Sequence, residues 1–235
     1  MLAEAGEARS QAPVARVAVI VALGVERACI GPTGPRVTLV QSGPGGARAA
    51  DAAGTVLAAG ACALVSFGLA GGVAADARPG RLLLPREVVT PDARRFVVEP
   101  RWHSRLAAAL ASVDERPLLA AAGVVASADE KRRAAALGAA GVDLESGAIA
   151  AAAAKAGIPF AVIRAVADGP GDELPAGIDT WVGADGETRL ARVVLAALKP
   201  ANWVPLVMLA RRYAASRRSL EYAARRLAQE DFLFA

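Results

Sequence analysis

The chain has 235 residues, 54% of them hydrophobic, and a formal net charge of +4. This length suits one large α/β domain with a full core and is short for two. No run of about 18 uninterrupted apolar residues occurs, so we expect no transmembrane helix and a cytoplasmic protein. One histidine and two cysteines argue against a metal site, and we expect Cys29 and Cys62 to be buried free thiols.

The composition divides the chain into three parts. Residues 1–13 carry charges but no apolar segment, which favours a disordered lead over a signal peptide. Residues 14–199 are expected to form the domain, and residues 200–235 a basic, amphipathic, helical extension. That helix would pack on its own domain or a partner subunit, or lie on an anionic membrane. Its few aromatic residues fit no nucleic-acid-binding motif, so no nucleic acid is expected as a partner.

The first element after the lead is an apolar run, Arg16–Leu23, which predicts a central strand. Glu26 follows the carboxyl end of this strand, where open α/β sheets place ligand-binding groups. An acid at a helix start also interacts favourably with the helix dipole, so the position alone leaves both roles open. The same patterns predict further strands at 37–41, 61–67, 82–84, 94–98 and 118–127, and helices at 47–59 and 189–198.

Two glycine-rich segments follow predicted strands. Residues 42–46, SGPGG, open a predicted helix, a weak signal for an anion at a helix N-terminus. Residues 68–72, GLAGG, are expected to form a loop after the strand at 61–67. Glycines there would let the backbone approach a ligand closely, or would serve only to turn the chain.

The most informative stretch runs from Val142 to Asp168. Glu145 precedes an alanine-rich helix that should stop at Gly157, and residues 160–166 read as a buried strand. Arg164 lies within that strand and needs a charged partner. If the helix packs back antiparallel to the strand, Glu145 and Asp168 face one pocket.

The same stretch resembles a known family. Val142-Asp-Leu-Glu-Ser, Ile158-Pro-Phe, Arg164 and Asp168 are similar to the signature of the purine nucleoside phosphorylase and methylthioadenosine/S-adenosylhomocysteine nucleosidase superfamily. Leu144 stands where methionine is usual, and Ala167 where serine is usual. The resemblance implies a three-layer αβα domain around a mixed, largely parallel, twisted sheet. The short first connection and the segment LKPANWVPLVMLARR look most like the hopanoid-associated branch, which removes adenine from adenosylhopane.

The resemblance also implies roles for individual residues. Asp168 would be the acid that protonates the purine, Glu145 would hold the ribose hydroxyls, and Glu26 would position the attacking water. Further substrate contacts would come from the residues that fall on the family's binding motifs. These are Leu144, Gly43 and Gly71 around the sugar, Ser127 and Asp129 at the base, and more weakly Trp102 and His103 at the 5′ side. Lys131 replaces the aromatic residue that usually stacks on the base.

Several alternatives stay open from the sequence. Phosphate could replace water as the nucleophile, in which case Arg27, Arg48 and Arg164 are the available cations. We expect Arg164 to form a structural ion pair instead. The substrate is expected to be adenosylhopane first, and methylthioadenosine or S-adenosylhomocysteine second, with no cofactor other than phosphate as a possible co-substrate. A homodimer is expected, and a non-catalytic nucleoside- or lipid-binding module is the alternative to an enzyme.

Overall fold

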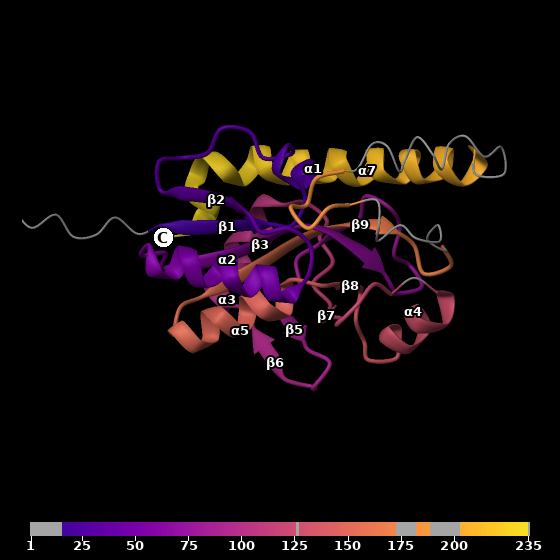
Figure 1. Ribbon diagram of the computed structural model, residues 1–235, viewed down its shortest axis with the longest axis horizontal. Helices are drawn as coiled ribbons and strands as arrows, with labels where there is room; N and C mark the ends of the chain where they lie inside the picture. The colour runs from indigo at the N-terminus through magenta and orange to yellow at the C-terminus, as the bar shows by residue number, and fades with distance from the viewer. Residues whose placement is uncertain (1–15, 126, 173–181, 189–202, 235) are drawn as a thin grey trace, which may run out of the picture.

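The computed structural model describes residues 16–125, 127–172, 182–188 and 203–234 (Figure 1). The predicted lead and the predicted helix at 189–198 lie outside these residues. In chain order the elements are β1 (Val17–Val21), α1 (Gly24–Arg27), β2 (Val37–Gln41), α2 (Gly46–Ala58), β3 (Ala63–Gly72), β4 (Leu82–Leu83), β5 (Glu87–Val89), β6 (Arg95–Val97), α3 (Pro100–Ala109), β7 (Leu118–Ala120), α4 (Ala128–Ala135), β8 (Gly141–Asp143), α5 (Ser146–Ala156), β9 (Phe160–Asp168), α7 (Trp203–Leu227) and the 3-10 helix η3 (Ala228–Leu233).

The strands form one mixed sheet in the order β2-β1-β3-β8-β7-β5-β6, with β9 paired to β3 and β4. One block, β2, β1, β3 and β9, is parallel. A second block, β8, β7 and β5, is also internally parallel but joins β3 in antiparallel fashion at its last two residues. Because the last two residues of β3 pair with β8, the carboxyl end of β3 is the point where the two blocks meet.

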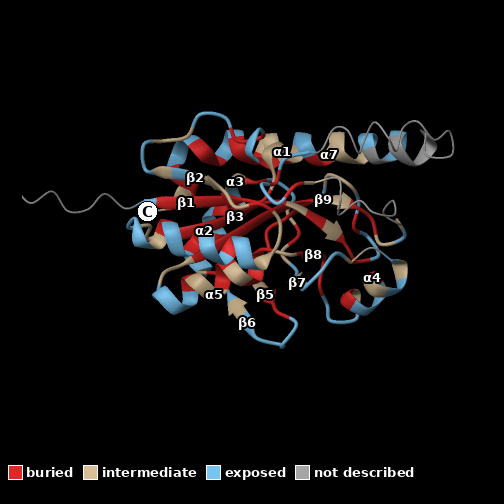
Figure 2. Cartoon of the chain, in the orientation of Figure 1, coloured by how far each residue is buried: buried red, intermediate tan, exposed pale blue. Residues whose placement is uncertain are grey.

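Helices cover both faces of this sheet. Helices α2 and α5 lie together on one face, and α7 crosses the other, as Figure 1 shows. The central strands are buried along their length, so the core lies between these layers (Figure 2). The expected three-layer αβα architecture is therefore confirmed. Both cysteines are free thiols as expected, although Cys62 is only half-buried.

Strand β3 corrects the prediction of a glycine-rich loop at residues 68–72. The strand runs on through Gly72, and its glycines sit within the sheet. A Cβ on Gly68 would lie 2.3 Å from Glu26 Oε1 and 2.4 Å from Arg164 Nη1. The glycine therefore makes room for two buried charged side chains on a strand that is otherwise packed.

The helix–strand unit at 142–168 forms as expected. Helix α5 ends at Gly157, whose φ of 68° is the left-handed conformation that glycine adopts most easily. Strand β9 then runs parallel to β3, and an irregularity in the pairing places Asp168 opposite Gly71. Strand β7 is much shorter than the predicted 118–127, because the chain leaves the sheet after Ala120.

The C-terminal helix packs on the domain over its second half. Leu220, Ala223 and Leu227 are buried, and Ser216 Oγ donates a 2.6 Å hydrogen bond to the carbonyl of Val166 in β9. Earlier in the helix, Met208 and its neighbour Val207 are exposed. None of the helices in the described part of the chain is long and apolar enough to cross a membrane.

The crowding at Gly68 yields a stability prediction. Gly68→Ala should lower the free energy of unfolding by about 2 kcal/mol or more, because Glu26 and Arg164 are buried and hydrogen-bonded and cannot move aside freely. Urea denaturation measures the change. Gly54→Ala is the matched control, since a Cβ at this position in α2 meets nothing within 4 Å. It should be neutral or stabilising by up to about 1 kcal/mol. Equal effects of the two substitutions would contradict this account.

Candidate active site

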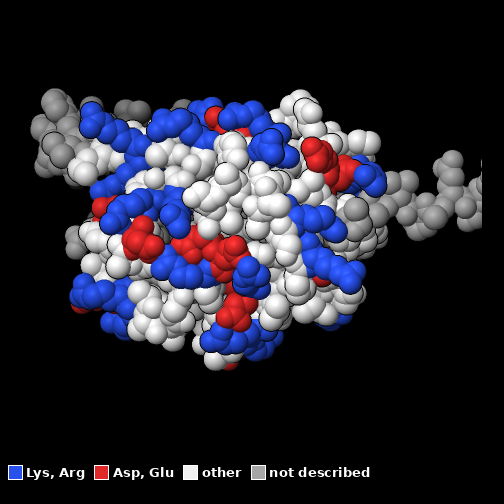
Figure 3. Space-filling view, turned by 180° about the vertical axis from the view of Figure 1, so that it is seen from behind, with Lys and Arg blue, Asp and Glu red and all other residues white. Residues whose placement is uncertain are grey.

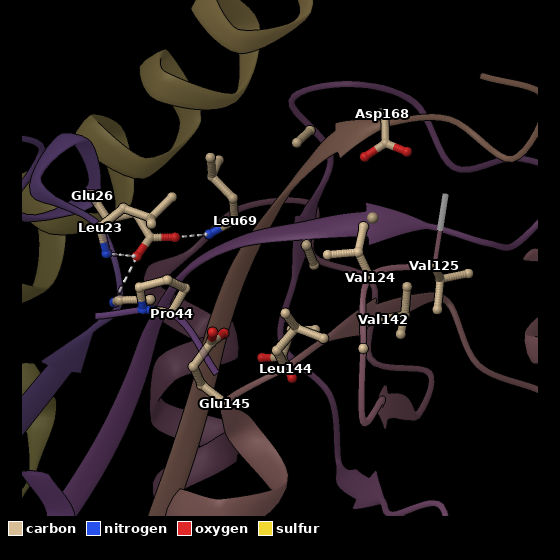
Figure 4. Close-up of a pocket in the computed structure, with 16 residues that line it drawn as sticks. Leu23, Glu26, Pro44, Leu69, Val124, Val125, Val142, Leu144, Glu145 and Asp168 are labelled. Carbon is tan, nitrogen blue, oxygen red and sulfur yellow. Dashed lines mark hydrogen bonds between the residues drawn. The ribbon is translucent and has the colours of Figure 1, made fainter. Parts of the chain in front are cut away.

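A cavity of about 250 Å³ lies where the two blocks of the sheet meet (Figure 4). Its walls come from the ends of β1, β3, β8 and β9 and from the segments that follow them. The lining residues are Ala22, Leu23, Glu26, Pro44, Leu69, Ala70, Gly71, Gly123, Val124, Val125, Val142, Asp143, Leu144, Glu145, Ala167 and Asp168. Four of these are acids, and none is a lysine or arginine.

Glu26 is held rigidly at the end of the cavity formed by β1 and α1. Its Oε2 accepts hydrogen bonds from the backbone N–H groups of Ala22 (2.8 Å) and Leu23 (3.0 Å), and its Oε1 accepts one from Leu69 (2.7 Å). The side chain is 2% exposed. A carboxylate has about four acceptor sites, so one remains for a ligand or water.

Glu145 lies between Gly45 and Arg164. Its Oε1 accepts a 2.8 Å hydrogen bond from the backbone N–H of Gly45, and its Oε2 is 3.7 Å from Arg164 Nη2. The glycine-rich turn before α2 therefore binds a carboxylate of the protein itself. Oε2 makes only the longer contact, and so retains capacity to accept hydrogen bonds from a ligand.

Arg164 supplies the positive charge behind these acids. It is 1% exposed, and its Nη2 forms a 2.6 Å ion pair with Asp143 and a 2.7 Å hydrogen bond to Ser66 Oγ. Its Nη1 is 3.9 Å from Glu26 Oε1. The expected structural ion pair of Arg164 is confirmed, and sequence reasoning gave no role to Asp143, its nearest partner.

Asp168 lies at the other end of the cavity, next to Gly71 and Val142. Its Oδ2 accepts a short hydrogen bond from the ammonium of Lys131, which is fully buried on α4. In Figure 4, Val124 and Val125 lie on the same side of the cavity as Asp168, and Glu26 on the opposite side. The cavity wall beside Asp168 is therefore aliphatic.

Burial raises the pKa of all three acids that were predicted to act on the substrate. For Glu26 the opposing influences are Arg164 and the backbone N–H groups. For Glu145 burial, together with Asp143 and Glu26, raises the pKa to about 7 against the attraction of Arg164. For Asp168 burial outweighs the lowering effect of Lys131. A buried carboxyl with a raised pKa can hold a proton near neutral pH, as a general acid must.

The structure brings together Glu26, Leu144, Glu145, Gly71 and Asp168, all of which line the cavity. The other predicted site residues do not line this cavity.

Ser127 and Asp129 are exposed at the start of α4 and do not line the cavity. Ser127 caps the helix by accepting from the backbone N–H of Glu130, and Asp129 forms a surface ion pair with Arg132. These helix-start roles use the polar groups that the resemblance assigned to the base. Because neither residue lines the cavity, the structure gives no support to the predicted contact with the base, which stays a prediction.

Three residues assigned to the sugar or to phosphate also lie outside the lining. Gly43 is packed under residues 182–188, where a Cβ would be 2.1 Å from the carbonyl oxygen of Ala184. Arg27 and Arg48 are exposed and donate to the backbone carbonyls of Leu39 and Pro44. Neither arginine lines the cavity, so their predicted contact with phosphate stays a prediction.

Trp102 and His103 are core residues of α3, not 5′-side contacts. Trp102 Nε1 donates a 2.8 Å hydrogen bond to the carbonyl of Phe232, and His103 Nε2 lies 2.8 Å from the carbonyl oxygen of Leu84. Both side chains are buried. Their polar atoms hold α3 against η3 and against Leu84, which follows β4.

The chain was compared with known protein families. The model of the phosphorylase superfamily matches residues 2–199. The chain belongs to the phosphorylase superfamily. With the acidic cavity described above, this membership identifies an enzyme of the nucleosidase and phosphorylase type. A search of curated protein sequences returned no match.

Solved structures of similar fold include several nucleosidases. S-adenosylhomocysteine nucleosidase from Streptococcus pyogenes, bound to 5-methylthiotubericidin, is 22% identical, with a TM-score of 0.61 over 68% of this chain and 86% of that one. The 5′-methylthioadenosine/S-adenosylhomocysteine nucleosidase from Neisseria meningitidis, bound to methylthio-immucillin-A, is 19% identical, with a TM-score of 0.64 over 90% and 99%. Futalosine hydrolase of Helicobacter pylori is 15% identical, with a TM-score of 0.67 over 91% and 99%. At these identities the likeness establishes the fold of this superfamily member.

The raised pKa of Glu145 predicts a pH dependence of stability. Between pH 4.5 and about 7 the folded carboxyl keeps its proton while the unfolded one has lost it, so stability falls as the pH rises through this window. A shift from 4.5 to about 7 corresponds to roughly 3 kcal/mol. Glu145→Gln should therefore be stabilising at pH 8 relative to its effect at pH 5, measured by denaturant titration at both values. A Glu145→Gln effect that is the same at both pH values would contradict the assignment.

Proposed function

We propose that the protein cleaves the N-glycosidic bond of an adenosyl compound and releases adenine. The observation that carries this proposal is the presence of three buried acids, Glu26, Glu145 and Asp168, around one cavity. Adenine is a poor leaving group until N7 is protonated, and the departing ribosyl group acquires positive charge. An acid at the base and carboxylates around the sugar meet these two requirements.

Each acid has a distinct part in the proposed reaction. Asp168 gives its proton to N7, so that the electron pair of the glycosidic bond can leave on the purine. Glu145 accepts hydrogen bonds from the ribose hydroxyls through the oxygen that Gly45 does not occupy. Glu26 uses its remaining acceptor site to orient a water toward C1′.

Water is the favoured nucleophile in this proposal. The described lining has four acids and no cation, and Arg164 is already engaged by Asp143. A phosphate dianion entering beside Glu26 would leave water for a cavity whose described lining holds acids and no cation to offset its charge. A neutral water meets no such repulsion.

The nucleophile is tested by following adenine and sugar products with and without phosphate. We expect the rate of adenine release to be unchanged by phosphate and the sugar product to lack a phosphorus signal. Phosphorus NMR and chromatography make the measurement. Adenine that appears only when phosphate is added would establish phosphorolysis instead.

The acid is tested by substitution. Asp168→Asn should reduce kcat by roughly 10²- to 10⁴-fold, since the amide cannot donate a carboxyl proton. Asp129→Asn is the matched control and should change neither kcat nor KM, because Asp129 is exposed and paired with Arg132. If wild type binds adenine but releases none from any adenosyl substrate, the alternative of a non-catalytic binding module is favoured.

We further propose adenosylhopane as the substrate and an anionic membrane as the place where it is met. The cavity is too small for a nucleoside and a long lipid together, so a lipid at the 5′ position would extend outside it. Val207 and Met208 are 53% and 47% exposed on α7. They lie about 6–8 Å along the helix before Arg212, which is ion-paired with Asp172.

Basic residues accompany these exposed apolar side chains. Arg211, Arg217, Arg218 and Arg225 are exposed on α7, and Figure 3 shows basic side chains gathered along the edge of the molecule where this helix lies. Exposed apolar and basic side chains on one helix suit the interface of an anionic bilayer.

Vesicle flotation tests the membrane proposal. The protein should float with vesicles containing phosphatidylglycerol, and Met208→Glu should weaken binding severalfold by placing a charge at the apolar interface. Leu137→Glu, at another exposed apolar position, should leave flotation unchanged. Equal flotation of the two variants would show that α7 is not the membrane contact. In a separate activity assay, a preference for methylthioadenosine over adenosylhopane would favour the alternative substrate.

A further inference from the structure

Lys131 is a fully buried lysine whose three N–H groups are all used. Its Nζ donates to Asp168 Oδ2, to the carbonyl of Gly169 (2.8 Å) and to the carbonyl of Asp172 (2.7 Å). Lysines are almost never buried unless they are paired. Here the charge partner is the acid assigned to the leaving purine.

We propose that Lys131 is a positioning residue: its ammonium fixes one oxygen of Asp168 and stabilises the carboxylate that remains after Asp168 has given its proton to the purine. This inference rests on the proposed function and deepens it. In the step itself, the proton moves from Asp168 to N7 and the glycosidic electron pair moves to the purine. Lys131 keeps its own protons throughout.

The geometry separates the two oxygens of Asp168. A Cβ placed on Gly71 would lie 3.6 Å from Oδ1 and 3.9 Å from Oδ2, so both oxygens are near the cavity wall, with Oδ1 nearer. Oδ2 is taken by Lys131, which does not line the cavity. Oδ1 is therefore the oxygen left to face a substrate, and Lys131 acts through Asp168.

Helix α4 holds Lys131 in place. Ser127 and Glu130 form a capping box at its start, and Lys131 N donates to the carbonyl of Ser127 at 3.1 Å. Lys131 and Ala134 are the buried residues of this helix. The segment predicted to contact the base thus anchors the lysine instead.

The C-terminal helix braces the other side of this contact. Asp172, whose carbonyl accepts from Lys131, also accepts a 2.7 Å hydrogen bond from the N–H of Gly169 through Oδ2. Its Oδ1 forms a 2.6 Å ion pair with Arg212 of α7. The turn that follows Asp168 is therefore fixed from α4 and from α7 together.

The charges around Asp168 determine in which direction the pKa of this acid changes when Lys131 is replaced. Burial raises the pKa of Asp168, Lys131 and Arg212 lower it, and Asp172 raises it. Glu26 and Glu145 line the same cavity from β1, α1 and α5. Removal of the Lys131 charge should raise the pKa of Asp168, so the acid would stay protonated to higher pH. It would also be a weaker donor, because its conjugate base would lose the ammonium.

The test compares Lys131→Met, Lys131→Arg and the exposed-site control Lys155→Met. In Lys131→Met the alkaline limb of the kcat/KM profile should move up by about 1–3 pH units while kcat at its optimum falls. Lys131→Arg should restore the limb toward wild type, and Lys155→Met should not move it. An unmoved limb in a folded, active Lys131→Met protein would overturn the inference. Thermal melts establish folding, and the neutral variant Lys131→Gln, with the same expected shift, serves if Lys131→Met does not fold.

A titration in the absence of substrate separates this inference from the proposed function. Carbon-13 NMR of labelled aspartate, assigned with Asp168→Asn, should show a higher pKa for Asp168 in Lys131→Met than in wild type. Absence of base release by wild type would refute the proposed function whatever the titration shows. An unchanged titration would refute the role of Lys131 even if wild type is active.

The ion pair between Arg212 of α7 and Asp172 is tested with a second pair of variants. Arg212→Met removes the ion pair with Asp172 and should shift the alkaline limb in the same direction as Lys131→Met, by less. Arg133→Met, at an exposed position of α4, is the control and should leave the profile unchanged. A larger shift in Arg133→Met than in Arg212→Met would contradict the arrangement.

Discussion

The site depends on one buried guanidinium. Arg164 lies in the middle of β9 with almost no solvent exposure, and Asp143, Glu145 and Glu26 approach it from three other elements. Each of these buried acids has lost its water and lies near other acids, and the guanidinium offsets part of the cost of ionising Glu26 and Glu145. The same contacts fix the distance between Glu26 and Glu145. Gly68 makes room for two members of this cluster, so a backbone position on β3 is set by charges on β9 and α1.

The positions of the two buried cations, Arg164 and Lys131, determine which charges line the cavity. Arg164 lies behind Glu26 and Glu145, and Lys131 lies behind Asp168, so both positive charges stand outside the lining. A ligand therefore meets acids first. Such a lining favours a neutral nucleophile and a sugar that becomes positively charged, and it disfavours an anion. The cations still act on the acids from behind, by opposing the effect that burial has on the pKa of each.

The sequence predicted the elements whose boundaries are set by nearby residues. The unit from Val142 to Asp168 carried its own helix start, its glycine stop and an apolar strand, and the convergence of Glu145 and Asp168 followed from how such units pack. Tertiary packing decided the rest. Residues 68–72 resembled a loop because glycine is rare in strands, and only the position of the Glu26 and Arg164 side chains explains why β3 needs glycine at residue 68. Lys131 looked like a missing aromatic, since nothing in the sequence shows that α4 turns it inward onto Asp168.

The C-terminal helix α7 lies in two environments. Its second half is buried against the domain through Leu220, Ala223 and Leu227, while Val207 and Met208 remain exposed. Arg212 lies between them and reaches Asp172, whose carbonyl in turn accepts from Lys131. A helix fixed to β9 by Ser216 cannot shift far without disturbing that contact. The exposed turn of α7 is therefore connected, through one ion pair and one lysine, to the carboxyl group of Asp168.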